Sequence, residues 1–151
     1  MEWLELRIPP PLQAAGVAGL MWAISAAITV WTLPIPQSVS LALFVVGAVV
    51  SALGVIEFKK AQTTVNPLAP QEASSLVMTG IYRWSRNPMY VGLGFVLLGW
   101  ACWLANGVAF LMLPLFVLSI NRLQIVPEER HLQAKFGDEF ADYSTKVRRW
   151  I

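Results

Sequence analysis

The sequence predicts an all-α integral membrane protein with four transmembrane helices and a C-terminal amphipathic helix on the cytoplasmic side. Hydrophobic residues make up 56% of the chain and charged residues 13%, against roughly 25% charged residues in soluble domains. Two long stretches, 8–56 and 87–121, contain no charged residue. The length of 151 residues is enough for one domain, 1–151.

The first uncharged stretch is too long for one span, because a bilayer core needs only about 20 helical residues. Pro34 and Pro36 divide it, and proline in a helix interior removes a hydrogen bond and clashes with the preceding turn. We therefore expect one helix over about 11–31 and a second over about 38–58.

The second uncharged stretch is divided at Asn106-Gly107, a strong turn dipeptide. We expect a third helix over about 88–104 and a fourth over about 108–123. Both are short for a 30 Å core, so packing or local bilayer thinning must support them. Pro114 is expected to kink the fourth helix.

Every lysine and arginine lies before the first predicted helix, between the second and third, or at and beyond the end of the fourth. These residues are Arg7; Lys59, Lys60, Arg83 and Arg86; and Arg122, Arg130, Lys135, Lys146, Arg148 and Arg149. The positive-inside rule makes this side cytoplasmic, together with both termini and the segments 59–87 and 124–151. We expect the plasma or inner membrane. The acidic Glu2 and Glu5 do not fit a signal peptide, so the first helix should be retained.

Several classes of function are disfavoured. A net charge of +2 does not predict nucleic-acid binding. One cysteine, Cys102, and one histidine, His131, offer neither an internal disulfide nor a metal site. The predicted spans contain no internal charge pair, so they do not resemble an ion pathway. Any chemistry is therefore expected in the two cytoplasmic segments.

The first of these segments ends in the run 80–92, Gly-Ile-Tyr-Arg-Trp-Ser-Arg-Asn-Pro-Met-Tyr-Val-Gly. Taken alone, the run reads as the start of a helix, with Asn87 as N-cap and Pro88 in the first turn. In that interpretation Arg83 and Arg86 only anchor the chain at lipid headgroups.

The second segment contains the acidic pair Glu128-Glu129, which reads on its own as a favourable charge at a helix N-terminus. Adjacent acids are not expected to share one helix face. Apolar residues follow at helical spacing, which predicts an amphipathic helix lying on the membrane and interrupted or bent at Gly137. They are Leu132, Phe136, Phe140, Tyr143 and Val147.

Together the two segments resemble the isoprenylcysteine carboxyl methyltransferase and phospholipid methyltransferase superfamily. The run 80–92 is similar to its Arg-His/Asn-Pro-x-Tyr-x-Gly signature, and 128–143 is similar to its Glu-Glu-x-x-Leu…Phe-Gly…Tyr element. The resemblance covers roughly 76–151. Asn87 stands where the eukaryotic carboxyl methyltransferases have His, so a role that needs an imidazole cannot be transferred.

The resemblance implies methyl transfer from S-adenosylmethionine, at the cytoplasmic membrane face, to a lipid or prenyl-like amphiphile with a carboxyl or amine acceptor. It places Arg86, Asn87 and Glu129 in catalysis, and Tyr82, Pro88, Tyr90, Arg122, Glu128, Glu129 and Leu132 in cofactor binding. No metal is implied.

The chemistry of the donor molecule assigns candidates to its parts. They are Glu128 or Glu129 for the ammonium group, Arg86 or Arg122 for the carboxylate, and Tyr82, Trp84 or Tyr90 for the sulfonium. Glu129 is the candidate general base for an amine acceptor.

Two alternatives stay open at this point. A membrane reductase that uses NADPH has a related C-terminal hairpin, although no basic cluster here suits a 2′-phosphate. A non-enzymatic helical scaffold would need the two motifs only as anchors. The sequence identifies neither the acceptor nor the oligomeric state.

Overall fold

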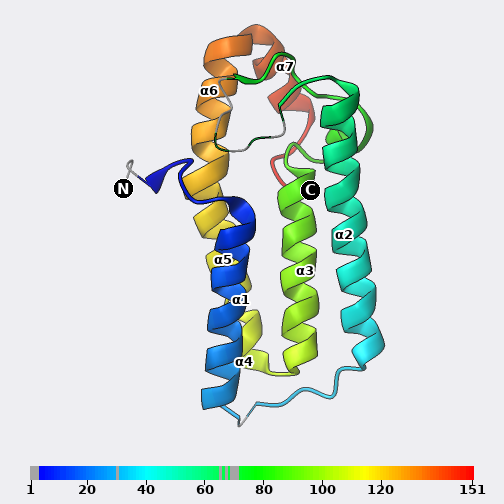
Figure 1. The fold of residues 1–151 in the computed structure, drawn as a ribbon, viewed down its shortest axis with the longest axis vertical. Helices are drawn as coiled ribbons and strands as arrows, with labels where there is room; N and C mark the ends of the chain where they lie inside the picture. The colour runs from blue at the N-terminus through cyan, green and yellow to red at the C-terminus, as the bar shows by residue number, and fades with distance from the viewer. Residues whose placement is uncertain (1–3, 30, 65, 67, 69–71) are drawn as a thin grey trace.

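The computed structural model describes residues 4–29, 31–64, 66, 68 and 72–151. Within this part of the chain the fold is all-helical, as predicted, and contains no β-strand (Figure 1). The helices are α1 (Pro10–Ala27), α2 (Gln37–Lys60), the 3-10 helix η3 (Gly80–Arg83), α3 (Pro88–Leu104), α4 (Gly107–Phe110), α5 (Leu113–Ile120), the π-helix η4 (Asn121–Ile125), α6 (Val126–Phe136) and α7 (Asp138–Lys146).

The long helices run side by side along the long axis of the molecule (Figure 1). Helices α4, α5, η4 and α6 follow one another end to end and form one rod, Gly107–Phe136. α2 packs extensively on α3, while α1 packs on α3, α4 and α5. Two helices, α2 and the rod, are long and apolar enough to cross a membrane, and α3 is a shorter apolar helix. The protein is therefore membrane-associated.

The structure confirms some predicted helix boundaries and corrects others. α3 has the predicted bounds, and α2 extends the expected 38–58 slightly at both ends. α1 ends at Ala27, before the predicted residue 31.

The fourth helix does not end at residue 123 as predicted, because the π-helix continues it without a break into α6. Glu128 and Glu129 therefore do not lie at a free helix N-terminus, and their carboxylates have partners elsewhere. Pro114 lies in the first turn of α5, just after the turn that separates α4 from α5. The interruption thus lies beside this proline, and the expected kink stays a prediction.

Close packing at glycines sets the position of α3 against α2. A Cβ atom on Gly47 of α2 would lie 2.6 Å from the backbone oxygen of Gly92 on α3. Small residues allow this approach of two helix backbones. The contact holds the start of α3, and with it the first motif, beside the end of α2.

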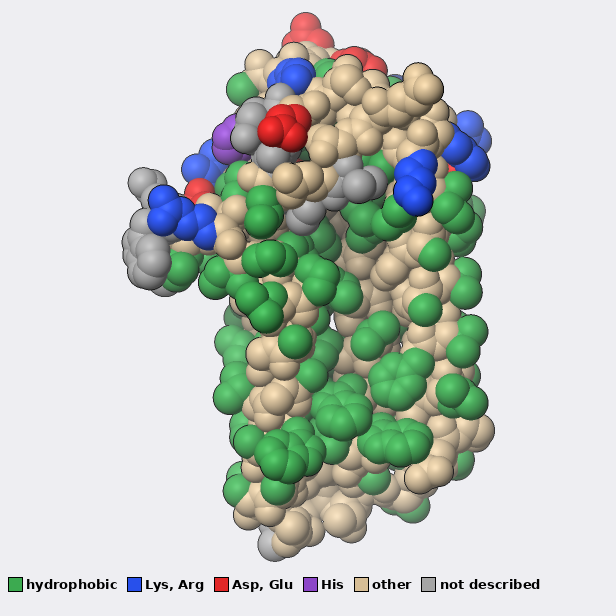
Figure 2. Space-filling model, in the orientation of Figure 1, with side chains coloured by type: hydrophobic (Ala, Val, Ile, Leu, Met, Phe, Trp, Pro, Cys, Tyr) green, Lys and Arg blue, Asp and Glu red, His purple; other side chains and the backbone are tan. Residues whose placement is uncertain are grey.

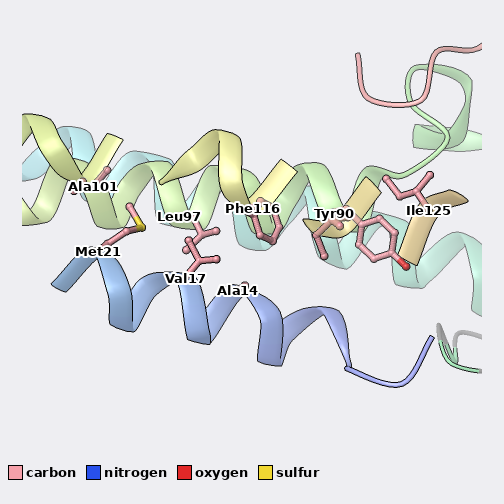
Figure 3. Close-up of a cluster of buried hydrophobic side chains, with 10 residues drawn as sticks. Ala14, Val17, Met21, Tyr90, Leu97, Ala101, Phe116 and Ile125 are labelled. Carbon is pink, nitrogen blue, oxygen red and sulfur yellow. The ribbon is translucent and has the colours of Figure 1, made fainter. Parts of the chain in front are cut away.

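The inner faces of α1, α3 and α5 meet in an apolar core. Figure 3 shows Val17 and Met21 of α1 pointing toward Leu97 and Ala101 of α3, with Phe116 of α5 beside them. Met21 and Ala101 are completely buried. Such close packing holds the three helices together through van der Waals contacts.

The turn between α3 and α4 forms at the predicted Asn-Gly dipeptide. Ala105 adopts a left-handed conformation, and the buried Asn106 side chain accepts a hydrogen bond from the backbone N–H of Val108. The Asn106 amide also donates to the carbonyl of Ile28 at the end of α1. One side chain thus caps a helix and ties it to α1.

The first motif is fixed to the end of α2 by Glu57. Its carboxylate accepts hydrogen bonds of 2.7 Å from Thr79 Oγ1 and from Lys60 Nζ. Gly80 has a φ of +57° and lies so close that a Cβ atom would be 2.5 Å from Glu57 Cδ. A glycine is therefore required where the chain enters η3.

Charged side chains gather at one end of the molecule. On the face in Figure 2, lysine, arginine, aspartate and glutamate lie around α7, the end of α6, the segment that follows α2 and the N-terminal segment, while hydrophobic side chains are spread over the rest of the bundle. This agrees with the predicted one-sided distribution of charge. Gly137, with a φ of +52°, separates α6 from α7 at this end, so the predicted break at Gly137 is confirmed.

Candidate functional site

A pocket lies at the charged end, between the end of α2, the start of α3, α6 and α7. The segment between α2 and η3 contributes a further wall. The residues that line the pocket are Phe58, Thr64, Asn66, Ala73, Ser75, Leu76, Val77, Tyr82, Arg86, Asn87, Met89, Tyr90, Glu128, Glu129, Leu132, Phe140 and Tyr143.

The pocket brings together most of the residues that the two motifs predicted. Tyr82, Arg86, Asn87, Tyr90, Glu128, Glu129 and Leu132 all line it. Pro88 is buried in the first turn of α3 and does not line the pocket. Arg122 is exposed on η4 and Trp84 is 79% exposed, so neither lies in the pocket wall.

Glu129 is held by two arginines. Arg86 Nη2 donates to Glu129 Oε1 at 2.8 Å. Arg149 donates from Nη2 to Oε2 at 2.6 Å and from Nε to Oε1 at 3.2 Å. The pair with Arg86 links the two motifs directly, and both oxygens of the carboxylate are occupied by charge-assisted hydrogen bonds.

Arg149 was not anticipated as part of this arrangement. In the sequence it belongs to a basic C-terminal run with Lys146 and Arg148, which reads as a membrane anchor. No spacing rule connects it to Glu129, because the contact depends on the path of the chain after α7. Nothing in the basic run distinguishes Arg149, which binds Glu129, from Lys146 and Arg148.

The Arg86 side chain is fixed on several sides. Its Nη1 donates to the carbonyl of Ser144 at 3.2 Å, and its guanidinium carbon lies 5.9 Å from the centre of the Phe140 ring. The third nitrogen, Nε, is buried and has no partner among the residues that the structure describes. It is thus the one nitrogen of this fixed guanidinium without a hydrogen bond in that part of the chain.

Glu128 has a different environment from its neighbour. Its Oε2 accepts a hydrogen bond of 3.1 Å from Tyr90 Oη on α3. Glu128 lies beyond the predicted fourth span, and burial among the pocket walls raises its pKa to about 7, with a smaller upward contribution from the charge of Glu129. The hydrogen bond from Tyr90 acts in the opposite direction. Glu128 can therefore change its charge near neutral pH.

Both acids of the pair line one pocket, although they do not lie on one face of the helix. Adjacent helical residues point about 100° apart. The pocket wall includes both directions: Glu128 binds Tyr90 on α3, and Glu129 binds Arg149 of the C-terminal chain.

Two tyrosines, Tyr82 and Tyr143, form another part of the pocket wall. Tyr143 Oη donates to the carbonyl of Tyr82 at 2.7 Å, and the Tyr82 ring packs edge-on against Phe58 at 5.4 Å between centroids. The Tyr82 hydroxyl is buried without a partner in the described part of the chain. Burial raises the pKa of Tyr82 well above its usual range, so the hydroxyl remains a donor.

Asn87 stands at the predicted N-cap position of α3, but its side chain does not cap the helix. Its Nδ2 donates to the carbonyl of Arg149 at 2.9 Å instead. The expectation of a side-chain cap is therefore wrong. A cap needs Oδ1 to accept from a helix N–H, whereas this hydrogen bond uses Nδ2 and turns the side chain toward the C-terminal chain.

The structure is thus an all-helical, membrane-associated fold. The two motif segments form a polar site at one end of its helix bundle. A family model described as "Phospholipid methyltransferase" matches residues 36–139. The chain belongs to this family.

Similar proteins include an uncharacterized protein of Haemophilus influenzae, 49% identical over 63 residues, which are 42% of this chain and 100% of that protein. Protein-S-isoprenylcysteine O-methyltransferase of Schizosaccharomyces pombe is 38% identical over 72 residues, which are 48% of this chain and 30% of the yeast protein. The mouse protein of the same name is 33% identical over 76 residues, 50% of this chain and 27% of its own length. The chain thus matches less than a third of these two enzymes. No solved structure gives a significant match.

Proposed function

We propose that this protein is an S-adenosylmethionine-dependent methyltransferase that acts at the cytoplasmic face of a membrane on a lipid or prenyl-like amphiphile. The observation that carries the proposal is the single pocket in which Arg86, Tyr90, Glu128 and Glu129 meet. Membership of the phospholipid methyltransferase family supports it. The names of the yeast and mouse relatives support methyl transfer to oxygen.

The membrane placement that we propose uses four spans. They are α1, α2, α3 and the apolar part of the rod up to about residue 123. The charged end then faces the cytoplasm under the positive-inside rule. In this placement the pocket lies where a headgroup arriving from the bilayer meets a water-soluble methyl donor.

The pocket fits the amino-acid end of S-adenosylmethionine. A zwitterionic amino acid needs an acceptor for its ammonium group and a cationic donor for its carboxylate. Glu128 supplies the acceptor, and the buried Nε of Arg86, which has no partner in the described part of the chain, supplies the donor. The exposed Arg122 is less suited to the carboxylate than Arg86.

S-adenosylmethionine supplies an electrophilic methyl group when it is bound. The residues of the chain contribute orientation: Glu128 and Arg86 hold one end of the donor, and the aromatic face of Tyr90 or Tyr82 can shelter positive charge. Phe58 and Met89, among other apolar residues of the lining, exclude water. Most of the rate enhancement is then expected from proximity and alignment.

The partners of Glu129 bear on the acceptor. Both of its oxygens are taken by guanidinium groups, so we assign it to positioning Arg86 and not to proton abstraction. A carboxylate acceptor needs no general base, whereas an amine acceptor must first lose a proton. The site therefore favours a carboxylate on the amphiphile.

Calorimetry of the detergent-purified protein with S-adenosylhomocysteine, and separately with NADPH, tests the proposal. We expect saturable binding of S-adenosylhomocysteine and none of NADPH. Protein that elutes as a folded, monodisperse species but does not bind S-adenosylhomocysteine would overturn the proposal. A labelled-methyl assay against total membrane lipids and prenylcysteine analogues then identifies the acceptor.

A further inference from the structure

The C-terminal chain that follows α7 lies against the first motif. The backbone N–H of Arg86 donates to the carbonyl of Arg148 at 3.0 Å. The next carbonyl, that of Arg149, accepts hydrogen bonds from Asn87 Nδ2 at 2.9 Å and from Ser85 Oγ at 3.4 Å. The start of α3 is therefore joined to the C-terminal chain at two successive carbonyls.

The same chain is also fixed to the rod. Trp150 Nε1 donates to Asn121 Oδ1 at 3.1 Å, at the first residue of the π-helix η4. The C-terminal chain is thus held in place by hydrogen bonds of its backbone carbonyls and of the Trp150 indole. None of them uses the guanidinium of Arg149.

The guanidinium of Arg149 is directed at Glu129 instead. It reaches both carboxylate oxygens, while Arg86 reaches only Oε1. The Glu129 side chain is 19% exposed and that of Arg86 is 13% exposed, so the central pair is largely removed from water. Arg149 is 37% exposed and closes the pair from the outer side.

We propose that Arg149 is a positioning residue of the methyl-transfer site, which acts through Glu129 on Arg86. By taking Oε2, Arg149 fixes the rotation of the Glu129 carboxylate, and the carboxylate then fixes the Arg86 guanidinium with its Nε available to a ligand. Without Arg149, Oε2 loses its partner and can attract the ammonium group that Glu128 should hold. The inference rests on the proposed function.

The test is a double-mutant cycle on the affinity for S-adenosylhomocysteine, measured by calorimetry on the full chain. The four proteins are wild type, Arg149→Met, Glu129→Gln and the double variant. If Arg149 acts through Glu129, Arg149→Met weakens binding strongly in the wild-type background and weakly in the Glu129→Gln background. We expect a coupling of roughly tenfold in affinity. Arg149→Lys keeps the charge but loses the bidentate geometry. Its affinity for S-adenosylhomocysteine should lie between those of wild type and Arg149→Met.

Arg148→Met is the matched control, because the Arg148 side chain is exposed and its contact with Arg86 uses only the backbone. It should change the affinity by less than about twofold. Equal losses from Arg149→Met in both backgrounds would mean that Arg149 only anchors the chain, and would overturn this inference while leaving the proposed function intact. Failure of the folded wild-type protein to bind would overturn both.

Discussion

The Tyr90 hydroxyl lies 3.1 Å from Glu128 Oε2 and donates a hydrogen bond to it across the pocket. This contact joins α3 to α6 and pairs a residue of the first motif with a residue of the second. It stabilises the ionised form of Glu128, while burial and the neighbouring charge of Glu129 favour the neutral form. Burial has the larger effect, so the pKa of Glu128 is raised to about 7.

Ligand affinity should therefore depend on pH through Glu128. The carboxyl group is mostly neutral below its raised pKa and ionised above it, and only the ionised form attracts an ammonium group. We expect the affinity for S-adenosylhomocysteine, measured by calorimetry, to rise roughly tenfold from about pH 5.5 to about pH 8. The midpoint should lie near the Glu128 pKa of about 7.

Glu128→Gln is the control for this pH dependence, because the amide keeps the shape of the side chain without its charge. The variant should bind weakly across the whole range, with no step near neutral pH. A step of unchanged size in Glu128→Gln would show that another group is responsible.

Replacing Tyr90 by Phe should move the same midpoint to higher pH. The change removes the hydrogen bond that favours the ionised carboxylate and keeps most of the buried ring. The neutral form of Glu128 is then favoured further, so its pKa rises above that of the wild type. The measurement is again the pH dependence of affinity, and a midpoint shifted to lower pH would contradict the assigned direction of the bond.

The sequence was sufficient where the signals are local. The start of α3 at Asn87-Pro88 and the turn at Asn106-Gly107 depend on the conformational preferences of adjacent residues, and both lie where predicted. The end of the fourth helix was not predictable in this way. An acidic residue such as Glu128 normally lies in water, and only its contact with Tyr90 on α3 explains its place inside the continued helix.

The two motifs predicted many of the residues that line the pocket, but not which of them bind one another. The motifs brought Glu129 and Arg86 to the site together, whereas the part of Arg149 depends on the course of the chain beyond α7. Asn87 was assigned a side-chain cap from its position alone, but its side chain donates to the Arg149 carbonyl of that same chain.

The close approach of α2 and α3 predicts opposite effects for two glycines. Gly47→Ala places a methyl group 2.6 Å from the Gly92 carbonyl oxygen, which is backbone and cannot move aside cheaply. We expect a loss of about 1–3 kcal/mol in the free energy of unfolding. Gly16→Ala on α1 meets nothing within 4 Å. It should be neutral or stabilising by up to about 1 kcal/mol.

Unfolding of both variants in mixed detergent micelles, followed by circular dichroism, measures the difference. The two substitutions add the same methyl group to a helix interior, so changes in helix propensity cancel in the comparison. Equal stability of the two variants would mean that α2 and α3 are not packed as closely as the structure has them.

The proposed four-span topology can be tested with single cysteines in a Cys102→Ala background. Lys59 follows the apolar part of α2 and Lys146 ends α7, and both are exposed at the charged end. Pro34 is exposed in the connection between α1 and α2, at the opposite end of the bundle (Figure 1). Four spans with the charged end inside place the first two positions on the cytoplasmic side and the third on the other side.

A membrane-impermeant maleimide should therefore label Pro34→Cys in right-side-out vesicles, and Lys59→Cys and Lys146→Cys in inside-out vesicles. Labelling of Lys59→Cys and Lys146→Cys from opposite sides would exclude an even number of spans between them. Labelling of all three from one side would mean that α2 does not cross the bilayer. The reverse of the expected pattern would keep the four spans and place the pocket on the outer face, away from a cytoplasmic methyl donor.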